Sequence, residues 1–192
     1  MSDGEEGGDK NEDGDKQTVD KIDINPGVQA IVMTSPMTDP LDSLPDEAFD
    51  NLLVVSTSGH PKEMEKSIVK RGKDPSNVAV IPVSGSTLRY DGSLNMSRRI
   101  GPNDLTSIGI TFSNLLNEIG GEDDEAWVVF DNINILMMYA NERNVYRFMN
   151  TAIGKTRQAG ARGLYCTVRD AIKDQSYDSF RQLCDEEIDI RR

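Results

Sequence analysis

The sequence predicts an α/β fold of three layers, in which helices cover both faces of a mostly parallel β-sheet. Short apolar runs rich in β-branched residues alternate along the chain with longer runs whose apolar residues recur at helical spacing. This alternation requires crossover connections, which place successive strands parallel to one another beneath the helices. The length of 192 residues suits one domain with a substantial core.

Six strands are predicted from runs in which apolar and β-branched side chains predominate. In chain order they are VQAIVMT (28–34), LLVVST (52–57), NVAVIPV (77–83), AWVVFD (126–131), GLYCTV (163–168) and EIDIR (187–191). Most of these runs are too apolar to alternate between buried and exposed residues, so we expect them to be covered on both faces.

Four amphipathic helices are predicted between and after these strands. HPKEMEKSIVKRG has Pro61 at a suitable first helical position, and NDLTSIGITFSNLLNEIGG runs from a capping Asn103 to Gly120. NERNVYRFMNTAIGKTRQAGA (141–161) and DQSYDSFRQLCDE (174–186) also bring their apolar residues to one side, which we interpret as packing against the core. Residues 84–103, with three glycines, are predicted to form the longest loop.

Charge and polarity separate the N-terminus from the rest of the chain. Residues 1–20 hold eight acids and two lysines, a net charge of −6, which is half of the total of −12. Such a segment has too few apolar side chains to offset the entropy lost on ordering, and it lacks the apolar core of a signal peptide. We therefore predict a disordered acidic tail over residues 1–22 and one folded domain over residues 27–192.

The composition limits the partners and the location. Aspartate outnumbers glutamate 21 to 12 and the pI is about 4.5, which suits a salt-rich cytoplasm; an acidic tail on an ordinary domain gives a similar balance. The negative charge opposes binding to nucleic acid, and no apolar run approaches the roughly 18 residues needed to cross a membrane. Cys166 and Cys184 lie in apolar patterns typical of buried residues and not of a disulfide or metal pair. We expect a soluble cytoplasmic protein.

Asp131 is the principal candidate for a functional residue. It directly follows the apolar run AWVVF, and the carboxyl end of a buried parallel strand opens into the crevice where ligands bind. An acid at this position is the usual Mg²⁺-binding residue of phosphate-loop ATPases when a phosphate loop is also present.

The order of parts from residue 27 onward resembles the RecA-like fold and, more narrowly, the KaiC-like ATPases of archaea and bacteria. The residues that carry the resemblance are GPNDLTSIGITFSNLLNEI, VVFDNINILMMYANERNVYRFMNTAIGKTRQAGARGLYCTV and FRQLCDEEIDIR. They are particularly similar to a group of KaiC-like proteins from haloarchaea. The resemblance implies a RecA-like phosphate-loop NTPase fold with Asp131 at the position of the Walker B acid.

Two catalytic parts of such ATPases do not match this sequence. The phosphate loop belongs after the first strand, where TSPMTDPLDSLPDEAF has no glycine and no lysine, and its prolines and acids oppose phosphate binding. The KaiC-like glutamate pair belongs after the second strand, where Thr57 and Ser58 stand. Glu63 lies further on, inside the first predicted helix, and takes no catalytic role. Without substrate phosphates, Asp131 binds a metal only weakly.

These departures predict a degenerate RecA/KaiC-like domain without a phosphate loop, that is, a pseudo-ATPase with no catalytic residues, metal or cofactor. It would act as a regulatory or interaction module in signalling or transcription and bind itself, a KaiC-like relative or a sensor protein. In this interpretation Asp131 caps the turn NIN that follows it.

Two alternatives stay open. A degenerate crevice formed by Thr34, Ser35, Ser56, Thr57 and Asp131 can hold a nucleotide or another small ligand without turnover, or can support an unfamiliar enzymatic reaction. A phosphoacceptor receiver domain fits poorly, because it needs an acidic pair after the first strand and a lysine after a late one. His60 is the sole histidine, which excludes a multi-histidine metal site, and we expect it in the loop before Pro61.

Overall fold

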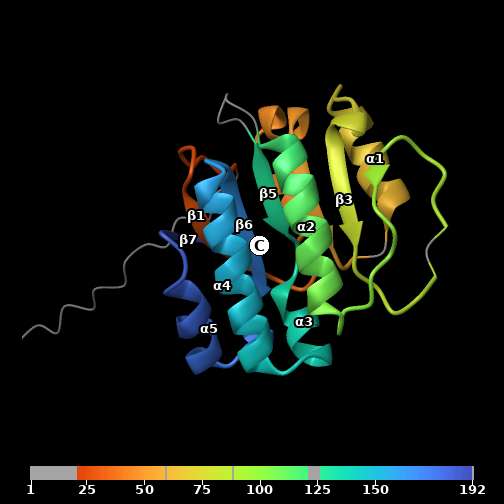
Figure 1. Cartoon of the computed structure of the whole chain (residues 1–192). Coiled ribbons are helices and arrows are strands. Elements are labelled where there is room, and N and C mark those ends of the chain that lie inside the picture. The colour runs from red at the N-terminus through yellow and green to blue at the C-terminus, as the bar shows by residue number, and fades with distance from the viewer. Residues whose placement is uncertain (1–20, 59, 88, 121–125, 192) are drawn as a thin grey trace, which may run out of the picture.

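The computed structural model describes residues 21–58, 60–87, 89–120 and 126–191. These residues form a seven-stranded, fully parallel sheet with strand order β4-β3-β2-β5-β6-β1-β7 (Figure 1). The strands are β1 (Gln29–Thr34), β2 (Leu52–Ser56), β3 (Val78–Pro82), β4 (Asn95–Met96), β5 (Trp127–Phe130), β6 (Arg162–Val168) and β7 (Glu186–Asp189). The predicted α/β class and the parallel sheet are confirmed.

Helices cover both faces of the sheet, as predicted. The α-helices are α1 (Pro61–Lys70), α2 (Leu105–Ile119), α3 (Ile133–Tyr139), α4 (Glu142–Gln158) and α5 (Asp174–Arg181). Four short 3-10 helices join them: η1 (Pro40–Ser43), η2 (Asp46–Asp50), η3 (Pro75–Asn77) and η4 (Arg169–Ala171). The helices α2 to α5 pack on one face, and α1, η1 and η2 pack on the other (Figure 1).

The core has two halves because strand side chains alternate between the faces. Val55 of β2 and Phe130 of β5 point toward α2 and α4, while Val54 and Val129 point toward α1 and η2. Phe130 has aromatic neighbours on its own side, with ring centroids 5.4 Å from Phe112 and 5.6 Å from Tyr165. Both faces of the central strands are therefore buried, which explains their nearly continuous apolar sequences.

The strand order places four carboxyl ends side by side at the middle of the sheet. The register pairs β2 with β5, β5 with β6, and β6 with β1, all in parallel. The connection from β1 to β2 passes over β6 and β5, because those two strands lie between them. Residues that follow β1, β2, β5 and β6 are thus brought together, although they are distant in the chain; Thr34 and Thr167, for example, are 133 residues apart.

Several predicted boundaries differ from the structure. The N-terminal cap of α2 is Asp104 and not Asn103, because the Asp104 carboxylate accepts the N–H of Ser107 at 3.0 Å. The predicted helix over 174–186 ends at Arg181, where turn hydrogen bonds lead the chain into β7. The predicted loop 84–103 contains β4, a two-residue strand that pairs with β3.

The folded part begins before residue 27. Ile22 and Ile24 are buried in the half of the core beneath η1, and the Ile22 N–H donates to the carbonyl of Ser43 at 2.8 Å. The last two residues of the predicted tail over residues 1–22 thus belong to the folded part, whereas residues 1–20 lie outside the described residues.

The two cysteines differ in burial, although the sequence predicts both to be buried. Cys166 is buried in β6, while Cys184 is only half-buried and follows α5; both thiols are free. Burial raises the pKa of the Cys184 thiol to about 12.

Within the described residues, no helix has the length and apolar character that a membrane span requires.

Candidate functional site

Asp131 lies at the carboxyl edge of the sheet, and its carboxylate turns toward the end of β2. Oδ1 accepts a hydrogen bond from the Thr57 hydroxyl at 2.8 Å, and Oδ2 accepts one from the Ser56 hydroxyl at 3.0 Å. The N–H of Thr57 is shared between the two oxygens, 2.9 Å from each, and the N–H of Ser58 lies 3.3 Å from Oδ2. Three consecutive residues therefore supply all of these donors.

This arrangement fills the acceptor capacity of the carboxylate. An ionised carboxylate has about four lone-pair positions, and four donor groups occupy them here. Burial raises the pKa of the Asp131 carboxyl, and the hydrogen bonds from Thr57, Ser56 and Ser58 oppose that rise. The Asp131 side chain thus ties the carboxyl end of β5 to that of β2.

The prediction that Asp131 caps the following turn is wrong. The cap is Asn132, whose side-chain oxygen accepts the N–H of Asn134 at 3.0 Å and begins α3. The sequence NIN therefore opens a helix and is not an isolated turn. Because Asn132 already occupies the capping position, the carboxylate of Asp131 is available to β2.

Asn134 connects the same edge to β6. Its amide oxygen accepts from the Thr167 hydroxyl and from the Val168 N–H, both at 2.9 Å, and its amide nitrogen donates to the Val168 carbonyl at 3.2 Å. The side chain of Asn134 is 6% exposed, so these bonds are shielded from water. Sequence reasoning missed Asn134; its signal is an asparagine in the first turn of a helix that starts at a strand end.

The predicted crevice residues separate into two groups. Ser56, Thr57 and Asp131 meet, as described above. Thr34 is buried and donates to the Thr167 carbonyl at 3.2 Å, and the hydroxyl of Ser35 pairs with that of Thr38 at 2.6 Å. Each predicted crevice side chain thus has a hydrogen-bond partner within the protein.

The segment after β1 is packed against the face of the sheet that α1 covers. Its residues form η1 and η2, with Leu41, Leu44 and Phe49 buried in the core on that side. The guanidinium of Arg71 at the end of α1 lies 5.0 Å from the centre of the Phe49 ring, and it pairs with Asp42 at 3.3 Å and with Asp46 at 3.1 Å. Two acids of this segment are thereby paired with the arginine that ends α1.

His60 and Glu63 lie at the start of α1. His60 precedes Pro61 as predicted, and its Nδ1 is 3.3 Å from a carboxylate oxygen of Glu63, with both side chains exposed. Glu63 lies inside α1, in agreement with the sequence analysis. Among the described residues, no three histidine, cysteine or acidic side chains gather closely enough to hold a metal ion.

Comparison with protein families matches residues 36–190 to a family of unknown function, DUF7504. The chain belongs to this family. The matched residues of DUF7504 include the η1–η2 segment, Asp131 and its partners after β2, and all of the helices. A search among curated proteins finds no match.

Solved structures show that this DUF7504 chain shares the fold of KaiC-like proteins. A KaiC-like protein from the hyperthermophilic archaeon Pyrococcus horikoshii OT3 superposes with a TM-score of 0.55 at 10% identity, over 85% of this chain and 72% of the other. A second protein from the same organism gives a TM-score of 0.55 at 12% identity, over 87% and 83%. The DUF7504 chain therefore has a RecA-like, KaiC-like fold.

Proposed function

We propose that the protein is a non-catalytic RecA-like domain, a pseudo-ATPase that works by binding other proteins in signalling or transcriptional regulation. The observation that carries the proposal is the engagement of Asp131. Its carboxylate stands where the resemblance predicts the Mg²⁺-binding acid, yet it accepts hydrogen bonds from Ser56, Thr57 and Ser58. Binding a metal would require breaking these bonds.

The segment after β1 supports the same proposal. A phosphate loop presents successive backbone N–H groups and a lysine to the phosphates. Residues 34–51 contain neither glycine nor lysine, and their acids would repel a triphosphate. Since Leu41 and Phe49 are buried, the segment also cannot leave the sheet to form such a loop without exposing apolar surface.

Transition-state stabilisation would also be missing after β2. The residues after β2 are Thr57 and Ser58 instead of a glutamate pair, and the hydroxyl and N–H of Thr57 are committed to Asp131. Each catalytic part commonly contributes several kcal/mol. Without these parts, we expect nucleotide hydrolysis at the uncatalysed background only.

Turnover of ATP and GTP tests the proposal. The full chain is incubated with Mg²⁺ and each nucleotide, and phosphate release is compared with that of the Asp131→Ala variant. The proposal expects both proteins to match the protein-free background. Release above that background by the wild type, lost in Asp131→Ala, would show that the edge is a working active site.

We further propose that the protein belongs to the haloarchaeal type and is adapted to high salt. After the first 20 residues, 25 acids face 19 bases, so molar salt should stabilise the fold by screening repulsion and by strengthening apolar burial. The measurement is a urea titration at several KCl concentrations, with the fluorescence of buried Trp127 as the signal. Stability should keep rising between about 1 and 3 M KCl; a plateau below about 0.5 M indicates simple charge screening instead.

A further inference from the structure

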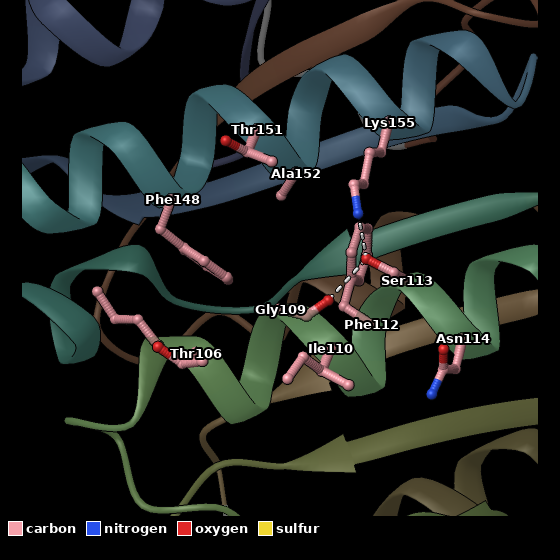
Figure 2. A pocket seen from close by; sticks show the side chains of 11 residues that line it. Thr106, Gly109, Ile110, Phe112, Ser113, Asn114, Phe148, Thr151, Ala152 and Lys155 are labelled. Carbon is pink, nitrogen blue, oxygen red and sulfur yellow. Dashed lines mark hydrogen bonds between the residues drawn. The ribbon is translucent and has the colours of Figure 1, made fainter.

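A surface groove lies between α2 and α4, on the face of the sheet that α2 to α5 cover. It encloses about 370 Å³ and is lined by Leu105, Gly109 and Ile110 from α2 and by Phe148, Thr151 and Lys155 from α4 (Figure 2). A second hollow continues it toward the start of α2 and adds Arg147 and Asp104. We call these residues together the α2–α4 groove.

The floor of the groove is apolar and firmly held. The ring of Phe148 rests on Phe130 of β5, with the centroids 6.1 Å apart in an edge-on arrangement. Gly109 lies beneath this ring, and a Cβ built there would be 3.6 Å from it, an ordinary van der Waals distance. Beside it, Ile110 is 59% exposed and adds an apolar side chain to the rim of the hollow.

The wall formed by α4 is positively charged, in contrast to the chain as a whole. α4 carries Arg143, Arg147, Lys155 and Arg157 against the single acid Glu142, a net charge of +3. The total is −12, so all other residues together carry −15. A basic helix in such a chain is a local exception that the overall composition does not explain.

Two of these cations lie along the groove. Arg147 and Lys155 are two turns apart on the same side of α4, about 12 Å at 1.5 Å per residue. The Lys155 ammonium donates to the Ser113 hydroxyl at 2.6 Å, and within the described part of the chain neither cation is in an ion pair. The one acid among the described lining residues, Asp104, caps α2.

We propose that the α2–α4 groove docks an acidic amphipathic helix of a partner protein. One apolar side chain of that helix enters between Ile110 and Phe148, and two carboxylates seven or eight residues apart reach Arg147 and Lys155. This inference rests on the proposed function as a binding module and names the chemistry of its partner. Nucleic acid suits the groove less well, because the net charge of the chain repels phosphates and the floor is apolar.

The test uses a pair of fluorescein-labelled helical peptides of about 20 residues. Both carry leucines at helical spacing; one has two glutamates seven residues apart, and the other has lysines at the same places. Fluorescence anisotropy is followed while each is titrated with the full chain at about 0.15 M KCl, where charge pairs act at short range. We expect the glutamate peptide to bind at least about tenfold more tightly.

Variants locate the binding surface. Ile110→Asp should weaken the glutamate peptide by about tenfold or more, since it places a like charge beside the apolar floor. Arg147→Glu combined with Lys155→Glu should reverse the preference, so that the lysine peptide binds more tightly. The matched controls lie on α1, on the other face of the sheet: Val69→Asp, at a residue 56% exposed, and Lys66→Glu with Lys70→Glu. These controls should leave both peptides unaffected.

Four results would overturn the docking proposal: no binding of the glutamate peptide up to about 1 mM; equal binding of both peptides; a larger effect of the α1 variants; or displacement of bound peptide by a single-stranded oligonucleotide. Self-association through the groove, seen as a dimer that Ile110→Asp dissociates, would likewise overturn it, because the occupant would then be a second copy of this chain.

If ATP is not turned over and the peptide fails to bind, only the docking proposal falls. Turnover of ATP would remove the proposed function whatever the peptides do.

Discussion

The carboxyl edge of the sheet and the α2–α4 groove differ in whether their side chains bond within the protein or face solvent. At the edge, the side chains of Asp131 and Asn134 form hydrogen bonds with the carboxyl ends of the neighbouring strands. In the groove, Arg147 and Ile110 face solvent. Groups that are satisfied internally hold a structure together, whereas groups left facing solvent are available to a partner. This difference is the basis of our proposal that a partner protein binds at the α2–α4 groove and not at the carboxyl edge.

At the carboxyl edge, the largest loss of stability that we predict follows the removal of the Asp131 carboxylate. Asp131→Ala leaves the N–H groups of Thr57 and Ser58 and two hydroxyls without their acceptor, so the free energy of unfolding should fall by about 2–3 kcal/mol. Urea unfolding measures the loss. The control is Asp23→Ala, which removes the same charge from an exposed residue and should cost less than about 0.5 kcal/mol. Equal stability of the two variants would mean that Asp131 is not a structural tie.

A second, smaller loss is expected on the β6 side of the edge. Asn134→Ala removes the acceptor of the buried Thr167 hydroxyl and of the Val168 N–H, and should reduce stability by about 1–2 kcal/mol. Thermal unfolding of Asn134→Ala beside an exposed control, Asn150→Ala on α4, checks this value. If Asn134→Ala unfolds like the control, the hydrogen bonds from Asn134 to β6 do not stabilise the carboxyl edge, and only the bonds from Asp131 to the end of β2 do.

The groove should give almost no change in stability. Ile110→Ser removes an apolar side chain that is already mostly in water, so the free energy of unfolding should stay within about 0.5 kcal/mol of the wild type. Its neighbour Ile108, fully buried in the core, provides the matched comparison, because Ile108→Ala should cost about 2–5 kcal/mol. A loss above about 1 kcal/mol in Ile110→Ser would show that this residue serves the core and not a partner.

The sequence predicted the strands well because both faces of the sheet are buried. Runs such as LLVVS and WVVF have no polar face, and this is the pattern that a parallel sheet under helices requires. The amphipathic helices α2 and α4 were equally readable from their apolar spacing. β4 was missed because two residues, Asn95 and Met96, carry no periodicity, and they pair only because the chain returns beside β3.

The candidate site was predictable in position but not in bonding. The residue type and the strand end located Asp131 at the edge, and the resemblance added a role for it. Which donors its carboxylate meets depends on the alignment of β2 with β5, in which Val55 lies opposite Phe130, and on α3 taking Asn132 as its cap. Neither follows from local sequence. The α2–α4 groove was likewise not foreseen, because it arises from the packing of two distant helices.

Calorimetric titration of the full chain with ATP, with and without Mg²⁺ and at molar KCl, tests the central claim most directly. The Asp131 carboxylate is hydrogen-bonded to Ser56, Thr57 and Ser58, and the segment after β1 is not a phosphate loop. We therefore predict no saturable heat up to about 1 mM nucleotide under either condition. Micromolar binding that requires Mg²⁺ and is lost in Asp131→Ala would contradict the account, because it would show that the bonds from Ser56, Thr57 and Ser58 open to admit a nucleotide.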